Sequence, residues 1–147
     1  ERTIALNPNA SLALASMGMR FQHVGDERGI ALVRKAMKLD PFIPSWSYFP
    51  IALYHFKRGE HEEALAAARK IDLPGLFWTQ LVLAGIYAEL GRENEARSAL
   101  GELLKLYPSF TTATAIDEMR KENLSDESIR HRIAALRKAG LPEGTGA

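Results

Sequence analysis

The segment Gly59-Glu60-His61-Glu62-Glu63-Ala64 recurs 32 residues later as Gly91-Arg92-Glu93-Asn94-Glu95-Ala96, and Gly25-Asp26-Glu27 begins 34 residues before it. An apolar helical pattern precedes each of the three glycines, and a second helical pattern follows each one. Prolines at 8, 41 and 108 keep step with this period. A repeat of about 34 residues made of helix, glycine turn, helix and proline is typical of stacked helical hairpins. The sequence therefore predicts an all-α fold.

Small residues at matched positions predict how the two helices of each hairpin pack. Gly18, Ala52 and Ala84 fall in the first helices, and Gly29, Ala64 and Ala96 fall one turn into the second helices. Small side chains at such a crossing allow two helix axes to approach to about 8–10 Å. The glycines that begin each turn are expected to be left-handed C-caps.

The pattern degrades after Phe110. Residues 111–123 read as a polar helix, and Ser125 is expected to cap a last helix that carries Ile129, Ile133 and Leu136 on one face. Gly140-Leu141-Pro142 predicts its end, with Leu141 against Leu136. We expect this helix to be a C-terminal capping helix that covers the last hairpin.

These residues resemble the tetratricopeptide repeat family over Ser11–Phe110. Phe21 and Tyr87 match its aromatic position, and Ala36, Leu39 and Pro41 match its closing signature. The resemblance implies a right-handed α-solenoid of antiparallel helix pairs. Its expected boundaries are a truncated preceding repeat (1–8), three repeats within 9–110 (10–43, 45–75 and 77–110), a degenerate helix plus capping helix (111–142) and a disordered tail (143–147).

Two departures from the family pattern fall in the second repeat. That repeat closes early, at Leu73-Pro74-Gly75. Pro50 lies within its first helix, so we expect that helix to start late or to kink.

Composition and motifs give no support for catalysis. The chain has no cysteine, so it has no thiolate nucleophile or thiolate metal ligand. His61-Glu62-Glu63 begins like a metalloprotease helix, but Leu65 stands where the second histidine would be. We expect a non-enzymatic protein without a metal or cofactor.

Charge and hydropathy predict neither nucleic-acid nor membrane binding. The 19 basic and 18 acidic residues give a net charge of +1, and no apolar stretch is long enough to span a bilayer. The C-terminal basic residues are expected to form a solvated helix face: Arg130, His131, Arg132, Arg137 and Lys138. A cytoplasmic location is expected.

The family resemblance implies that the first helices line a concave groove that contacts a partner. Carried onto this chain, the contact positions are Leu12, Met19, Gln22 and His23, then Trp46, Phe49, Leu53, Phe56 and Lys57, then Trp78, Leu81 and Glu89, with Ala15, Gly85 and Ala88 beside them. The family's chaperone-peptide clamp uses lysine and asparagine, and apolar or small residues stand at those places here, so that role is not expected. Trp46 and Trp78 could equally well be core residues.

Phe49, Leu53 and Phe56 would be unfavourably exposed in an empty groove, and such a patch usually marks an interface. We expect the groove to bind an apolar or amphipathic peptide or helix, from another protein or from another part of the same polypeptide. The alternative occupant is a second copy of this chain, which would form a homodimer.

An alternative function is that of a C-terminal regulatory domain in a larger protein. The sequence does not begin with methionine, and residues 2–6 read as the end of a helix cut within a repeat. The closing stretch from His131 to Pro142 is similar to the ends of bacterial regulators that join tetratricopeptide repeats to a class III nucleotide cyclase domain or a winged-helix domain. A full-length reading frame that extends far upstream would favour this alternative.

Overall fold

The computed structural model describes residues 8–144, which form eight α-helices and one 3-10 helix and no strand. The predicted all-α fold is confirmed. The repeat end predicted over 1–8 lies outside the described residues except for Pro8, which begins the first helix. The elements are α2 (Pro8–His23), α3 (Arg28–Leu39), η1 (Ser45–Ser47), α4 (Tyr48–Lys57), α5 (His61–Ala68), α6 (Phe77–Glu89), α7 (Glu93–Leu106), α8 (Thr112–Lys121) and α9 (Asp126–Ala139).

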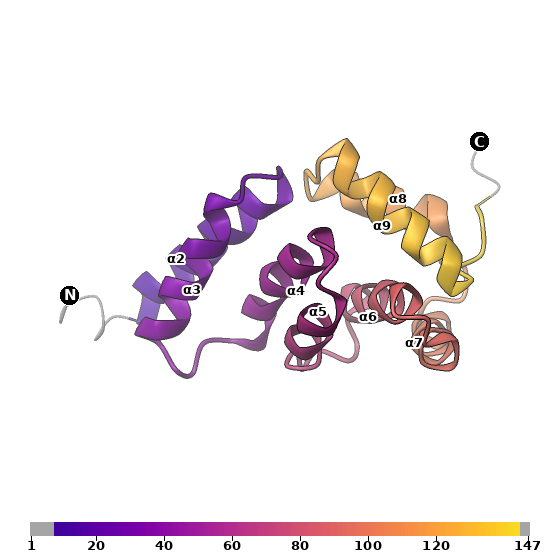
Figure 1. Cartoon of the computed structure of the whole chain (residues 1–147), viewed down its shortest axis with the longest axis horizontal. Helices are drawn as coiled ribbons and strands as arrows, with labels where there is room; N and C mark the ends of the chain where they lie inside the picture. Colours follow the sequence, from indigo (N-terminus) through magenta and orange to yellow (C-terminus); the bar gives the residue numbers. More distant parts are fainter. Residues whose placement is uncertain (1–7, 145–147) are drawn as a thin grey trace.

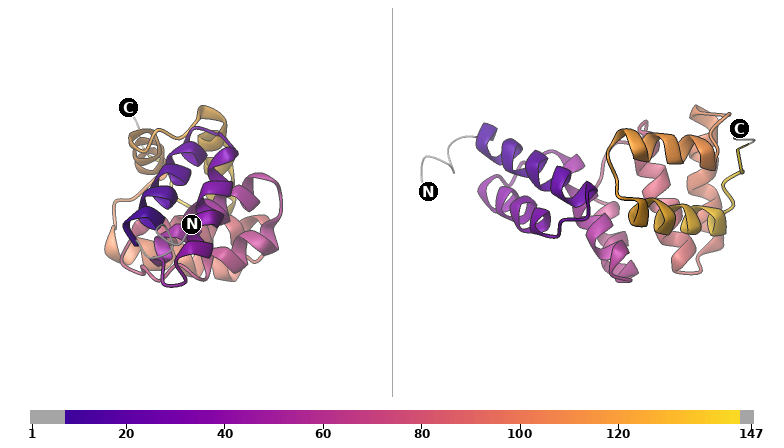
Figure 2. Two further views of the ribbon diagram at one scale, coloured as in Figure 1. Left: turned by 90° about the vertical axis from the view of Figure 1, so that its left-hand side faces the viewer. Right: turned by 90° about the horizontal axis from the view of Figure 1, so that it is seen from above.

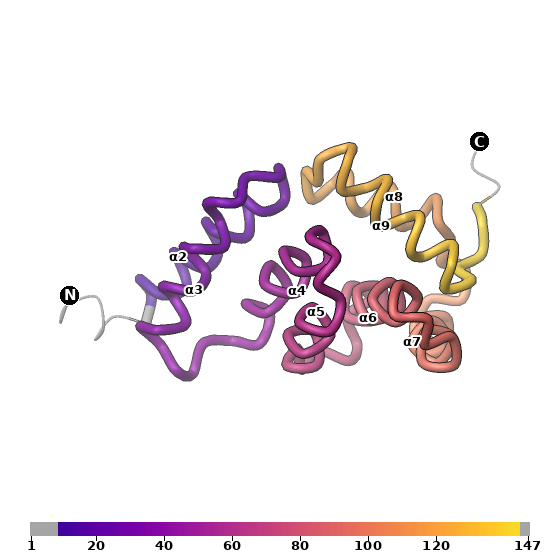
Figure 3. Tube along the Cα trace, viewed as in Figure 1, coloured from indigo at the N-terminus to yellow at the C-terminus, as the bar shows by residue number. Residues whose placement is uncertain are grey.

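The helices pack largely in sequential pairs: α2 with α3, α4 with α5, α6 with α7, and α8 with α9. The pairs follow an arc in which the α2–α3 and α8–α9 pairs lean toward each other above α4 (Figure 1). The tube trace shows that the turn after α2 and the turn before α9 are the parts that come closest (Figure 3). Seen from above, α8 and α9 lie over α6 and α7 (Figure 2).

The glycine and alanine positions behave as the sequence predicts. Gly25, Gly59 and Gly91 all have positive φ, between 73° and 83°, which is the left-handed conformation expected of a C-cap. Ala52, Ala64, Ala84 and Ala96 are all buried at the hairpin crossings. The expected close approach of paired helices is therefore present.

The second hairpin starts late, as Pro50 predicts. Ser45–Ser47 form the 3-10 turn η1, and α4 begins only at Tyr48, so Pro50 lies in the first turn of the helix, where its missing N–H is not needed. Trp46 consequently lies before α4 and not within it. The partner helix α5 has only 8 residues, in keeping with the early end predicted for this repeat.

The predicted helix signals after Phe110 are confirmed. The Ser125 hydroxyl accepts the Ser128 N–H at the start of α9, and Gly140 ends α9 with φ 98°. Ile129, Ile133, Leu136 and Leu141 are all buried in one core with residues of α6, α7 and α8.

The tail prediction needs correction at Glu143, while residues 145–147 lie outside the described part of the chain. The Glu143 carboxylate accepts hydrogen bonds from Arg137 Nε at 2.6 Å and from the Thr112 hydroxyl at 2.8 Å. Pro142 adds a carbonyl that accepts the Thr112 N–H at 2.9 Å. The chain after α9 is therefore attached to the start of α8.

Helix α9 packs mainly on α6, on the face that the sequence assigned to the groove. A Cβ built at Gly85 would lie 3.6 Å from Ala135 Cβ, so the absence of a side chain there leaves space for α9. Lys138 Nζ donates to both carboxylate oxygens of Glu89, at 3.1 and 3.2 Å. The third hairpin's share of the expected groove is thus occupied by the chain's own last helix. Within residues 8–144 no helix has the length and apolar character needed to cross a membrane.

Candidate functional site

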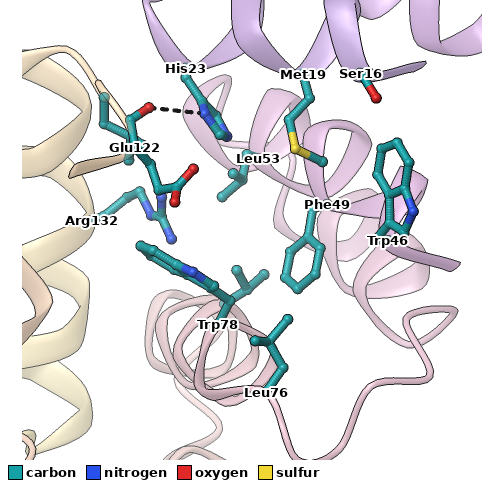
Figure 4. Close-up of a pocket in the computed structure, with 12 residues that line it drawn as sticks. Ser16, Met19, His23, Trp46, Phe49, Leu53, Leu76, Trp78, Glu122 and Arg132 are labelled. Carbon is teal, nitrogen blue, oxygen red and sulfur yellow. Dashed lines mark hydrogen bonds between the residues drawn. The ribbon is translucent and has the colours of Figure 1, made fainter. Parts of the chain in front are cut away.

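A cavity of about 400 Å³ lies between the arms of the arc, and its walls come from the first, second, third and last helix pairs. Helix α2 forms one wall, η1 and α4 form the next, α6 forms the floor opposite, and the α8–α9 turn with α9 closes the remaining side (Figure 4). The lining residues are Ser16, Met19, His23, Trp46, Phe49, Leu53, Leu76, Trp78, Val82, Glu122, Leu124 and Arg132.

Six of the twelve predicted contact residues line this cavity, namely Met19, His23, Trp46, Phe49, Leu53 and Trp78. They come from three different hairpins and surround one space (Figure 4). Each is partly buried, so none is fully exposed to solvent and none is wholly enclosed in a core. Trp46 and Trp78, which sequence alone could not divide between core and contact, both border the cavity.

The other predicted contact residues lie elsewhere. Leu81 is only 2% exposed and Phe56 only 4%, because α9 covers both; the Phe56 ring lies 4.8 Å from the His131 ring. The expectation that these two face an open groove is therefore corrected: both are core residues. Ala15 and Gly85 are likewise buried, and Glu89 is paired with Lys138.

Gln22 and Lys57 lie beside the main cavity and border a smaller hollow of about 30 Å³. Leu12 on α2 and Ala88 on α6 are partly buried but do not line the main cavity.

The most informative residue was assigned incorrectly from sequence. Arg132 was placed on a solvated helix face, but it is only 8% exposed, and its guanidinium lies over the Trp78 ring at 5.5 Å from the centroid. No ion pair or hydrogen bond joins this guanidinium to another described residue. The signal was present in the sequence: Arg132 follows Ile129 by three residues and precedes Leu136 by four, which places it on the apolar face of its helix.

Burial lowers the pKa of Arg132 to about 10, because removing a guanidinium from water disfavours its charged form. It remains protonated at neutral pH and contributes a positive charge to an otherwise apolar wall. Its contact with Trp78 offers partial compensation through the electron-rich face of the ring.

His23 connects the first helix pair to the last at the edge of the cavity (Figure 4). Its backbone carbonyl accepts the Ser125 N–H at 3.0 Å, and its ring Nδ1 lies 3.1 Å from the Glu122 carbonyl oxygen. A carbonyl can only accept, so Nδ1 carries the proton. Burial, and then the positive charge of Arg132, lower the pKa of His23 below 6.5. At neutral pH the ring is therefore uncharged.

The side chains around the cavity suit binding better than bond-making chemistry. The walls are mainly apolar and aromatic, with one unpaired cation, and Glu122 borders the opening as an exposed carboxylate. Residues 8–144 contain no group of three or more histidine, aspartate or glutamate side chains arranged to hold a metal ion.

Comparison with known proteins leaves the chain without an assigned family. No protein-family model matches it. The curated proteins contain no significant match to it either. The similarity to tetratricopeptide repeats therefore stays a prediction.

Proposed function

We propose that this chain is a protein-interaction module that binds an apolar or amphipathic peptide or helix in the cavity between its helix pairs. The observation that carries the proposal is the cavity itself, in which Met19, Trp46, Phe49, Leu53 and Trp78 from three hairpins surround about 400 Å³. Binding sites of roughly 300–1,000 Å³ with apolar walls and few polar groups are typical of proteins that enclose a ligand group.

The finer description of the fold is part of this proposal. We infer a right-handed solenoid of tetratricopeptide-like repeats, supported by the period of the glycine turns and by small residues at the crossings in all three hairpins. In such an arrangement the first helices α2, α4 and α6 share the inner surface. Since α9 already covers much of α6, the partner would contact mainly α2, α4 and the start of α6.

A partner side chain would be stabilised by removal of apolar surface from water. Phe49, Leu53 and Met19 are partly buried without a partner, so a bound segment gains about 25 cal/mol for each Å² of apolar surface that it covers. An amphipathic helix could place two or three side chains, spaced three or four residues apart, in the cavity.

The experiment is selection of binding peptides from a displayed library on the purified chain, followed by affinity measurement on two variants. Phe49→Asp places a carboxylate in the cavity and is expected to weaken the selected peptides at least tenfold. Phe42→Asp is the matched control, because Phe42 is 92% exposed and does not line the cavity. Equal binding by wild type and both variants would show that the cavity is not the binding site.

Light scattering over a concentration series tests the competing occupant, a second copy of the chain. A wild-type dimer that becomes monomeric on Phe49→Asp, with Phe42→Asp still dimeric, would show that self-association fills the cavity. Monomers in all three cases, with circular dichroism unchanged, would leave the cavity free for a different partner.

A further inference from the structure

The charge of Arg132 has no counter-charge in the described structure. Its side chain is more than nine-tenths buried, it makes no hydrogen bond or ion pair within residues 8–144, and it borders the cavity. A guanidinium carries five N–H donors in a planar fork, and a buried charge is costly unless it is paired. One aromatic face, that of Trp78, satisfies none of these donors as a hydrogen-bond acceptor would.

The surroundings of Arg132 explain why it cannot find its acceptor within the chain. On α9 its neighbours Ile129, Ile133 and Leu136 are buried apolar residues, and α6 presents Trp78 and Val82 toward it. His23 on α2 uses its protonated Nδ1 for the Glu122 carbonyl, so it faces this region as a neutral ring. Glu122 borders the same cavity, but its side chain is exposed and forms no ion pair with Arg132.

We propose that the cavity selects a peptide segment that carries an acidic side chain next to apolar side chains, and that Arg132 binds the carboxylate. This inference rests on the proposed function and adds the chemistry of the partner. The carboxylate and the guanidinium would form two parallel N–H···O hydrogen bonds, the geometry that makes arginine a better carboxylate ligand than lysine. The apolar part of the segment would lie against Phe49, Leu53 and Met19 (Figure 4).

Charge complementarity is the argument for this occupant. A neutral apolar segment would fill the space but would seal an unpaired guanidinium away from water, which is unfavourable. A segment with a carboxylate removes that cost and gains a charge-assisted hydrogen bond. A basic segment would meet a like charge.

A pair of small probes tests the contact without knowledge of the natural partner. 4-Phenylbutyrate and its uncharged amide have nearly the same shape and differ in the group that would meet Arg132. The only two tryptophans of the sequence, Trp46 and Trp78, both line the cavity, so their indole N–H signals in an NMR titration report on it directly. We expect the acid to shift both signals with at least about tenfold tighter binding than the amide.

Variants of Arg132 and Glu122 complete the design. Arg132→Gln is expected to bring the acid and the amide to the same affinity, and Arg132→Lys to restore only part of the difference, because lysine lacks the fork. Glu122→Gln is expected to strengthen binding of the acid, since it removes a negative charge from the rim. Acetate should bind much more weakly than 4-phenylbutyrate, because it lacks the apolar part.

Several results would overturn the inference. Equal binding of acid and amide by the wild type would do so and needs no variant, and so would a preference for the acid that persists in Arg132→Gln. Acetate or inorganic phosphate binding as tightly as 4-phenylbutyrate would show a simple anion site instead.

The displayed-peptide selection separates this inference from the proposed function. Selected peptides that depend on Phe49 but contain no excess of aspartate or glutamate, and bind Arg132→Gln as well as wild type, would support the proposed function and overturn the role of Arg132. If no peptide depends on Phe49, the proposed function fails, while the acid and amide titration still decides whether Arg132 recognises a carboxylate.

Discussion

Gly18 on α2 and Gly29 on α3 face each other so closely that neither position has room for a Cβ atom. A Cβ at Gly18 would lie 2.5 Å from the Gly29 carbonyl oxygen and 2.6 Å from Val33 Cγ2. A Cβ at Gly29 would overlap the Gly18 carbonyl oxygen and lie 2.9 Å from Phe21 Cβ. The first hairpin therefore uses a glycine pair where the second and third use alanines.

Gly18→Ala is expected to lower the free energy of unfolding by about 1–3 kcal/mol, because the new methyl group must push two backbones apart. The matched control is Gly101→Ala in α7, where nothing lies within 4 Å of the added Cβ. That change should raise stability by about 0.5–1 kcal/mol through the better helix propensity of alanine. Urea unfolding measures both, and a Gly18→Ala protein as stable as wild type would contradict the close packing.

The seat of α9 on α6 can be tested at two neighbouring alanines. Ala135 is fully buried against Gly85, whereas Ala134 is exposed. Ala135→Asp should destabilise the protein by about 2 kcal/mol or more, since it buries a carboxylate without a partner. Ala134→Asp should change stability by less than about 0.5 kcal/mol. Similar losses from both, measured by thermal unfolding, would mean that α9 is not packed in this way.

The buried histidine at the junction of the first and last pairs predicts a pH dependence. Because the pKa of His23 is lowered in the folded state, the unfolded chain binds a proton first as the pH falls through 6.5. The unfolding free energy should therefore decrease from about pH 7.5 toward the folded-state pKa, and stay level above the unfolded value as far as this group is concerned.

His23→Asn is the control for that prediction, because its amide N–H₂ can replace the Nδ1 donor to Glu122 without titrating. Urea unfolding at a series of pH values should show a smaller decrease in this variant than in wild type. Identical pH profiles for the two proteins would show that His23 is not the group responsible.

Arg132→Met is expected to increase the free energy of unfolding by about 1 kcal/mol or more, because it removes an unpaired buried charge and fills the same space. Loss of the contact with the Trp78 ring offsets part of this gain. Thermal unfolding of the two proteins gives the answer. A large decrease in stability would instead indicate that Arg132 serves the fold, and a site kept at the expense of stability would no longer be indicated.

Local rules explain why the helices and their turns could be predicted from the sequence. Gly25, Gly59 and Gly91 act within their own turns, and Ser125 caps a helix through a residue three positions away. Such signals need no knowledge of the rest of the chain. Pro50 and the short α5 were likewise readable, because a proline restricts its own backbone.

The candidate site was predicted only in part, because its outcome depends on where α9 packs. Met19, Trp46, Phe49 and Trp78 surround one cavity as expected, since they follow from the register of α2, η1–α4 and α6. The burial of Phe56 and Leu81 could not be derived from their own hairpins. It results from a helix that begins 70 residues after Phe56 and returns across α6.

The contact of His23 with Glu122 spans 99 positions of the chain, and it changes what kind of unfolding this molecule should show. An open array of helical hairpins has only nearest-neighbour interfaces, so its ends can fray independently. Here the first and last described pairs also touch each other, so the loss of one removes contacts from the other. Closing so long a loop costs conformational entropy that the search for the folded state must overcome. The chain is therefore expected to fold more slowly than its local hairpins would suggest and to melt as one cooperative unit.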